Sequence, residues 1–132
     1  MKVRPLTLEG ISTPYLSLTL GGVYEVLAIE GDMYRILTDP QCWPYGNDPV
    51  LYESALFEVV DGAIPGFWVE ERLEDGSVFQ SPPEWGGCFF DDFHDGDAAS
   101  RRIFRDVVRR YYPWTWKRNG VLHKGLEENN DN

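Results

Sequence analysis

The sequence predicts an α+β protein that is mainly β: a small antiparallel barrel followed by one C-terminal amphipathic helix. Three observations lead to this prediction. Short runs rich in β-branched and aromatic residues, typical of strands, recur between residues 23 and 90. Turn signals separate these runs every ~8–12 residues, and the 13 Gly and 9 Pro of the chain supply them. After residue 100 the apolar residues change to a helical spacing.

The first elements are an irregular arm and a hairpin. The arm covers residues 1–20, contains Pro5 and Pro14, and has room for one short strand. Residues 23–29 and 33–38 are predicted to pair around the turn Glu30-Gly31-Asp32. After a loop that runs from residue 39 to residue 49, five further strands are predicted, at 50–52, 56–60, 67–73, 77–80 and 88–90.

Two of these strands are joined by Asp75-Gly76, a signal for a type I′ hairpin turn in which both turn residues have positive φ. The Pro-rich segment 81–85 predicts a turn or one turn of 3₁₀ helix. The aromatic residues of the strands, Tyr24, Tyr34, Phe57, Phe79 and Phe89, are expected to belong to the core.

A helix is predicted over residues 98–112, because apolar residues recur there at i, i+1, i+4, i+5, i+8 and i+9. Asp97 or Ser100 can cap its start, and Pro113 ends it. Five arginines occupy its other faces, where they either neutralise the acidic body of the chain or meet phosphates. Trp114 and Trp116 follow at strand spacing, and residues 118–132 are expected to form a polar, mobile tail.

The length of 132 residues fits a single domain, which we expect to cover residues 1–117. No apolar run approaches the ~18 residues that a membrane span requires, and no apolar stretch follows the charged N-terminus as in a secretory signal. We therefore expect a cytoplasmic protein. Cys42 and Cys88 are expected to be reduced thiols that pack as small buried side chains.

The charge of the chain is divided unevenly. Residues 1–100 hold four cations and eighteen carboxylates, a net of −14, whereas residues 101–132 hold eight cations and four carboxylates, a net of +4. An acidic body repels the phosphate backbone, so nucleic-acid binding by that body is disfavoured. The same field attracts a basic partner and accelerates the encounter. The alternative is a solvated acidic surface that keeps the protein in solution.

Several strand and turn motifs resemble those of small bacterial SH3-like barrel proteins. The motifs are Gly22–Leu27, Met33–Ile36, Leu56–Asp61, Ile64–Val69, Pro82–Glu84 and Phe90–Asp95. The resemblance covers about residues 22–96 and implies an SH3-like fold. Some proteins of this type look like immunity proteins, which neutralise a toxin in the cell that produces it. The resemblance therefore implies a binding function.

One acidic cluster, residues 91–97, contains four aspartates and His94. As a calcium loop starting at Asp91 it fails, because Phe93 stands at position 3 and Arg102 at position 12, where a bidentate Glu is required. The cluster is better explained as an acidic turn that caps the following helix. Contact with a partner and metal binding remain open alternatives.

Catalytic motifs are missing from the sequence. His94 is the one plausible general base, and no nucleophile elbow or Gly-rich phosphate loop occurs. Glu70 and Glu71 are adjacent on a predicted strand, so their side chains point to opposite faces and make a poor glycosidase pair. No cofactor is expected. A small metal- or His94-dependent enzyme is one alternative function, and a peptide-binding SH3-like adaptor is another.

The function predicted from the sequence is that of an immunity protein, which binds one basic toxin domain and covers its active site. Trp43 and Tyr45 lie in a Pro/Gly loop, where aromatic side chains make good interface anchors. Carboxylates are expected to steer and pair with lysines and arginines of the toxin. The predicted carboxylates are Asp32, Asp48, Glu70, Glu71, Asp91 and Asp92. Neither nucleic acid nor membrane is expected as a partner.

Overall fold

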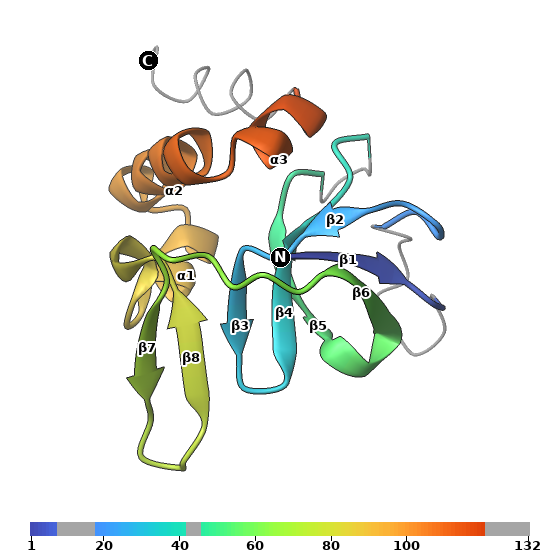
Figure 1. Ribbon diagram of the computed structural model, residues 1–132. Coiled ribbons are helices and arrows are strands. Elements are labelled where there is room, and N and C mark those ends of the chain that lie inside the picture. The colour runs from blue at the N-terminus through green and yellow to red at the C-terminus, as the bar shows by residue number, and fades with distance from the viewer. Residues whose placement is uncertain (8–17, 42–45, 121–132) are drawn as a thin grey trace. The chain divides into compact units, whose positions relative to one another are not determined.

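Figure 1 shows the computed structural model of the chain, which describes residues 1–7, 18–41 and 46–120. The chain is α+β, as predicted, and divides into two compact units, Met1–Ser81 and Pro82–Asn132. The eight described strands belong to the first unit and form two antiparallel sheets, and the described α-helices belong to the second. Both sheets are open, so closure into a barrel remains a prediction.

The smaller sheet has the strand order β2-β1-β6. It consists of β1 (Lys2–Pro5), β2 (Tyr24–Glu25) and β6 (Phe57–Asp61). β1 is the short strand expected in the N-terminal arm, and its register with β6 shifts between Lys2 and Val3. A 3₁₀ turn, η1 (Ser54–Leu56), precedes β6, so this strand starts one residue later than predicted.

The larger sheet has the order β5-β4-β3-β8-β7. It consists of β3 (Ala28–Glu30), β4 (Met33–Leu37), β5 (Pro49–Glu53), β7 (Val69–Arg72) and β8 (Val78–Ser81). The predicted hairpins are confirmed as β3–β4 and β7–β8, and the pairing of β3 with β8 joins them side by side.

The strand predicted over residues 23–29 is wrong as a single element, because it is divided between the two sheets. The backbone N–H of Val26 donates to the Met1 carbonyl at 2.9 Å, next to the β1–β2 ladder. The N–H of Leu27 donates to the Arg35 carbonyl of β4, also at 2.9 Å. Both residues are fully buried. The chain therefore leaves one sheet and enters the other within two residues.

The core of the first unit is formed by residues from both sheets and is rich in aromatic residues. Phe57 packs edge-on against Tyr52 with ring centroids 6.1 Å apart and tilts against Tyr34 at 5.9 Å. Tyr24 and Phe57 are buried as expected. The buried cluster consists of Val3, Leu18, Tyr24, Val26, Ile36, Tyr52 and Phe57.

The β7–β8 turn differs from the type I′ turn predicted for Asp75-Gly76. Gly76 has φ +87°, but Asp75 does not have a positive φ. The Gly76 N–H donates to the Leu73 carbonyl and the Leu73 N–H to the Ser77 carbonyl. This pattern needs only one left-handed residue, as in a hairpin loop that ends in a glycine bulge. Hydrogen bonds within the turn favour this conformation, because the Asp75 carboxylate accepts from the Ser77 N–H and hydroxyl.

The second unit contains more helix than the single helix predicted. The 3₁₀ turn η2 (Pro83–Trp85) is confirmed, and three α-helices follow. These are α1 (Phe89–His94), α2 (Ala98–Tyr111) and α3 (Pro113–Arg118). The helix predicted at 98–112 is confirmed as α2 within one residue. The strand predicted at 88–90 and the strand spacing assigned to Trp114 and Trp116 are wrong, since these residues fall at or within α1 and α3.

Trp85 organises the aromatic core of this second unit. Its ring stacks on Phe104 of α2 with centroids 5.1 Å apart and on Tyr112 at 5.8 Å. Phe90 of α1 meets the same ring edge-on at 5.5 Å. Phe89, Phe90 and Phe93 are buried together on one side of α1, which a strand cannot achieve because neighbouring side chains alternate between its faces.

In the described part of the chain no helix combines the length and the apolar character that crossing a membrane demands.

Candidate protein-binding surface

The strand register of the larger sheet aligns carboxylates on one face. Directly opposed residues of antiparallel strands share a face, and one such row crosses all five strands. We call this row the acidic row, and its residues in spatial order are Glu71, Phe79, Glu30, Met33 and Glu53. The next row lies on the opposite face, where Ile29 and Tyr34 pack against the core.

Charged and apolar side chains alternate along the acidic row. Glu71 and Glu53, at its two ends, are exposed, whereas Phe79 and Met33 between them are half-buried. Strands lie ~4.8 Å apart, so the row is ~19 Å long and its carboxylates repeat every ~10 Å. The row thus offers partly accessible apolar side chains between carboxylates, a combination suited to a partner with both basic and apolar side chains.

The charge of Glu30, at the centre of the row, is compensated by Arg35 of the same sheet. Its Oε2 atom accepts from Nε of Arg35 at 2.6 Å, and Nη1 of Arg35 donates to the Pro49 carbonyl at 2.8 Å. The side chains of Arg35 and Glu30 are only 7% and 15% exposed. Because a buried cation without a partner is costly, Glu30 is needed to hold Arg35 in place. Glu53 and Glu71 form no ion pair within the described residues, so the charge available to a partner lies at the two ends.

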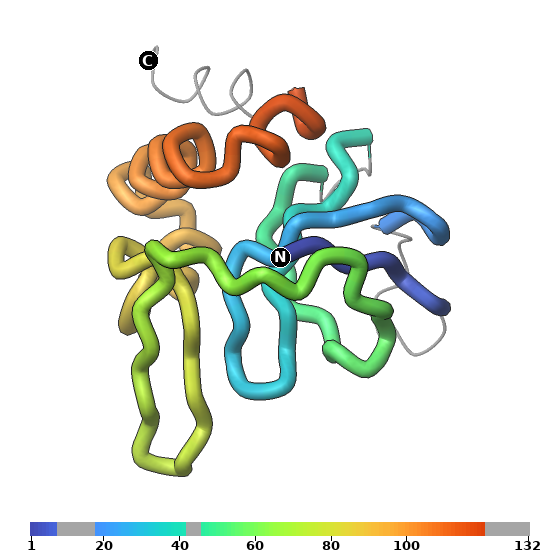
Figure 2. Tube along the Cα trace, in the orientation of Figure 1, coloured from blue at the N-terminus to red at the C-terminus, as the bar shows by residue number. Residues whose placement is uncertain are grey.

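Two turns add acidic residues at one end of this sheet. The Gly31 N–H donates to the Val78 carbonyl at 2.9 Å, which places the β3–β4 turn beside the first residue of β8. Figure 2 shows the β3–β4 and β7–β8 turns at the same end of the sheet. Asp32, Glu74 and Asp75, in or next to these turns, are exposed. Hydrogen bonds from the Ser77 hydroxyl and N–H lower the pKa of Asp75, so it remains a carboxylate.

The structure brings only some of the predicted partner-binding residues together. Glu71 belongs to the acidic row, and Asp32 lies in the adjoining β3–β4 turn. Glu70 is opposed to Gln80 and therefore lies on the other face, which confirms that Glu70 and Glu71 point apart.

The remaining predicted residues lie elsewhere. Asp48 precedes the first residue of β5, at the opposite end from Glu53, and its backbone pairs with Thr38 through hydrogen bonds of 3.0 and 2.8 Å. Asp91 and Asp92 are exposed in the first turn of α1, in the second unit. Trp43 and Tyr45 lie outside the described residues.

Sequence reasoning missed Glu30, Glu53, Met33 and Phe79 as members of one surface. Each residue sits on a different strand, and they meet only through the register of three strand pairs. Each strand alone shows on which of its two faces a carboxylate lies, because Glu53 and Glu71 alternate with neighbours that point to the opposite face. Combining such signals requires the strand order, which runs β5-β4-β3-β8-β7 and does not follow the chain.

The acidic segment 91–97 of the second unit acts as a helix cap. The Asp97 carboxylate accepts from the Ser100 N–H at 2.9 Å and from its hydroxyl at 2.7 Å, as predicted for the start of α2. These two hydrogen bonds, with a smaller contribution from Arg102, lower the pKa of Asp97. His94 is exposed, with its ring edge-on to Phe93 at 5.4 Å. Within residues 1–7, 18–41 and 46–120, no three His, Cys, Asp or Glu side chains are grouped to hold a metal ion.

Cys88 is exposed, which corrects the expectation that it packs as a small buried side chain. It stands immediately before the first residue of α1, where the chain turns from Gly87, with φ +63°, into the helix. The buried apolar side chains of this segment are Phe89, Phe90 and Phe93, which follow Cys88 in α1. Cys42 lies outside the described residues.

Comparison of the chain with models of protein families, with curated proteins and with solved structures finds no match. The acidic row of the first unit is therefore the feature of the chain that points most directly to a function.

Proposed function

We propose that the chain is a protein-binding module whose acidic row docks on a basic protein surface. We further propose that it serves as an immunity protein, which neutralises a cognate bacterial toxin by covering its active site. The observation that carries the first proposal is the acidic row, with exposed Glu71 and Glu53 on either side of half-buried Phe79 and Met33. The second rests on the resemblance of residues 22–96 to small bacterial SH3-like barrel proteins, some of which look like immunity proteins.

The two kinds of side chain in the row have different roles in this proposal. The exposed carboxylates, together with Asp32, Glu74 and Asp75, attract the basic partner and orient it as it approaches. Phe79 and Met33 are the apolar contacts that exclude water once the partner is seated. Toxin active sites that bind anionic substrates carry lysines and arginines, so covering such a site with carboxylates blocks the substrate by occupying its binding groups.

An SH3-like fold is part of the same proposal. Two features support it: the chain passes from one sheet to the other at Val26 and Leu27, and a five-stranded and a three-stranded antiparallel sheet share one core. A strongly bent segment that contributes to both sheets is what a small barrel requires. Trp43 and Tyr45 remain predicted anchors, and a cytoplasmic location follows if the toxin is neutralised in the cell that makes it.

Co-expression with the product of the neighbouring gene tests this function. We expect the two proteins to purify together, and we expect cells that express both to grow where cells that express the neighbour alone do not. The double variant Glu53→Lys/Glu71→Lys should lose both effects, because it reverses the exposed charges at the two ends of the row. If the neighbouring protein is harmless alone and forms no complex, the immunity proposal fails.

A further inference from the structure

The exposed surface of α2 is basic although the protein as a whole is acidic. From Ala98 to Arg118 the chain holds seven cations and one carboxylate, Asp106, which gives this stretch a net charge of +6 in a protein of net charge −10. The cations are Arg101, Arg102, Arg105, Arg109, Arg110, Lys117 and Arg118. The binding function proposed above uses the acidic row and leaves this surface without a role.

The arginines of α2 are arranged along a line. Arg102, Arg105 and Arg109 follow at i, i+3 and i+7 and therefore lie on one face of the helix. At a rise of 1.5 Å per residue, the first and last are ~10 Å apart along the axis. Arg102 and Arg109 are exposed, and the Arg109 side chain is 61% accessible.

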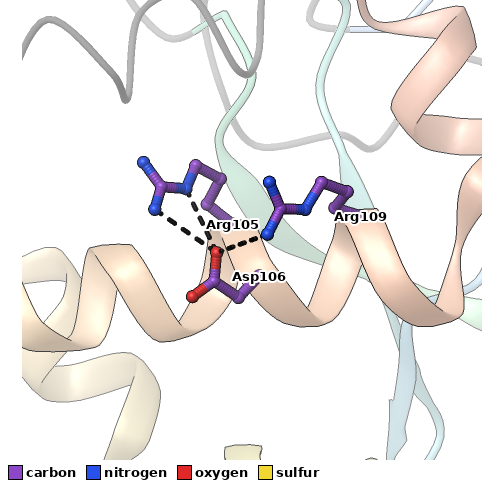
Figure 3. A network of polar contacts seen from close by, with 3 residues as sticks. All are labelled: Arg105, Asp106 and Arg109. Atoms are coloured by element: carbon purple, nitrogen blue, oxygen red, sulfur yellow. Dashed lines mark hydrogen bonds and ion pairs between the residues drawn. The ribbon is translucent and has the colours of Figure 1, made fainter.

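Asp106 shows how this face receives a carboxylate. Its Oδ1 atom accepts from Nε and Nη2 of Arg105, both at 3.3 Å, and lies 3.5 Å from Nη2 of Arg109 (Figure 3). Each guanidinium has five N–H donors, so both arginines retain donors that Asp106 does not use. The trio also keeps a net charge of +1. Asp106 thus contacts both side chains without cancelling the charge of the face.

An apolar side chain lies within the same basic surface. Ile103 is 42% exposed and follows Arg102 directly, and Arg110 stands seven residues later on the same side of the helix. Arginine beside an exposed apolar residue is a composition found at protein–protein interfaces, where arginine is enriched and often contributes most of the affinity.

From this arrangement we infer that the exposed face of α2 is a second docking surface, and that it binds an acidic amphipathic helix of a protein partner. Carboxylates at i and i+7 of that helix repeat every ~10 Å and meet Arg102 and Arg109. Ile103 lies next to Arg102 at one side of this line, so an apolar side chain on the same side of the partner helix covers it. This inference does not depend on the acidic row, which belongs to the other unit of the chain.

Two observations favour an acidic protein over a nucleic acid. Asp106 stands in the middle of the arginine line, where it would face the phosphates of a nucleic acid that followed the helix. In addition, Met1–Ser81 holds four cations and thirteen carboxylates, a net of −9, in the same chain. A nucleic acid is a long polyanion and is repelled by this charge, whereas a short acidic helix contacts α2 alone.

Fluorescence anisotropy with the full chain tests the inference. The probe is a labelled Ala-rich peptide of about 18 residues with Glu at i, i+7 and i+14 and Leu between them. A peptide of the same composition with a central proline, single-stranded DNA of ~20 nucleotides and the corresponding duplex serve as comparison probes. We expect the helical peptide to bind best, and Arg102→Gln/Arg109→Gln to weaken its binding about tenfold.

The control variant, Arg4→Gln/Arg72→Gln, removes the same charge from the first unit and should change the affinity less than about twofold. Far-ultraviolet circular dichroism shows whether both variants keep their helices. Equal weakening by the two double variants would overturn the inference, since it would show a response to net charge. Tighter binding of either DNA, equal binding of the proline peptide, or no binding of the helical peptide at millimolar concentration would overturn it as well.

Discussion

Tyr24 is a buried tyrosine whose hydroxyl connects three segments of the first unit. The hydroxyl accepts from the Thr19 N–H at 2.6 Å and donates to the Asp39 carboxylate at 2.8 Å. The Thr19 hydroxyl donates to the other carboxylate oxygen at 2.7 Å. Tyr24 is 2% exposed and Asp39 is 4% exposed. These hydrogen bonds attach the chain before β2 and the chain after β4 to the buried side chain of Tyr24.

We predict that Tyr24→Phe lowers the free energy of unfolding by ~1–3 kcal/mol, because it removes two hydrogen bonds from a buried network. Burial, with a smaller contribution from Asp39, raises the pKa of Tyr24 above its usual 10.0. The stabilisation linked to this pKa is therefore complete below pH 10 and disappears as the pH rises through the raised pKa. Urea unfolding between neutral and alkaline pH measures both effects, and the alkaline loss should be smaller in the variant. An unchanged alkaline loss would contradict this assignment.

Asp97 provides a second test at the scale of single residues. Its pKa is lowered in the folded protein, so the linked stability is present above the usual pKa of 3.8 and is lost as the pH falls through the lowered value. We predict that Asp97→Ala lowers the melting temperature at neutral pH, whereas Asp97→Asn, which still caps α2, lowers it less. Thermal unfolding at neutral and acidic pH should show a smaller acid-induced loss in both variants than in the wild type. A melting temperature of Asp97→Ala equal to that of the wild type would show that the cap contributes nothing.

At the scale of elements, the β7–β8 hairpin positions Glu71 and Phe79 within the acidic row. Its turn requires positive φ at Gly76, and a Cβ atom added there meets nothing within 4 Å. Any cost of a side chain at this position is therefore conformational.

We predict that Gly76→Ala lowers the free energy of unfolding by ~1–2 kcal/mol, the cost of left-handed backbone for alanine. Gly66→Ala is the matched control, since Gly66 also has open space around its Cβ position but no positive φ. Chemical denaturation of the two variants measures the difference. Equal stabilities would mean that the turn adopts another conformation.

The sequence predicted the elements that depend on local signals. The glycine turn at Gly31 and the i, i+4, i+8 spacing of Phe104, Val108 and Tyr112 identify a hairpin and α2 without tertiary information. The strand prediction for residues 88–90 was wrong because three aromatic or sulfur-containing residues in a row fit a strand as well as a helix. Only the continuation to Phe93, one turn after Phe89 and Phe90, marks it as helical.

The candidate site was less predictable than the fold. Glu71 and Asp32 were identified from charge alone, but charge does not show which carboxylates share a face. The break at Val26 and Leu27 also changes which strands are neighbours, because it ends one strand pairing and begins another. The acidic row depends on this pairing, so it could not be derived before the register of the five strands was known.

At the scale of the whole molecule, charge is divided between the two units. Met1–Ser81 has a net charge of −9 and Pro82–Asn132 a net charge of −1, the latter because the arginines of α2 offset its carboxylates. The first unit therefore produces most of the field that a basic partner meets.

We predict that the association rate with a basic partner falls by at least tenfold when ionic strength rises from ~0.02 M to ~0.5 M, because screening shortens the range of this field. The dissociation rate should change much less, since Phe79 and Met33 contribute contacts that salt does not screen. Stopped-flow or surface-based kinetics at several salt concentrations measure both rates. An association rate independent of salt would exclude electrostatic attraction as the first step.

The most direct test of the acidic row compares two neighbouring residues. Glu70 and Glu71 are both exposed on β7 and differ in the face on which they lie. Titration calorimetry of the partner against the two single variants therefore separates the row from the overall charge. We predict that Glu71→Lys weakens binding about tenfold or more and that Glu70→Lys leaves it nearly unchanged. Equal losses in both variants, or a loss confined to Glu70→Lys, would contradict it.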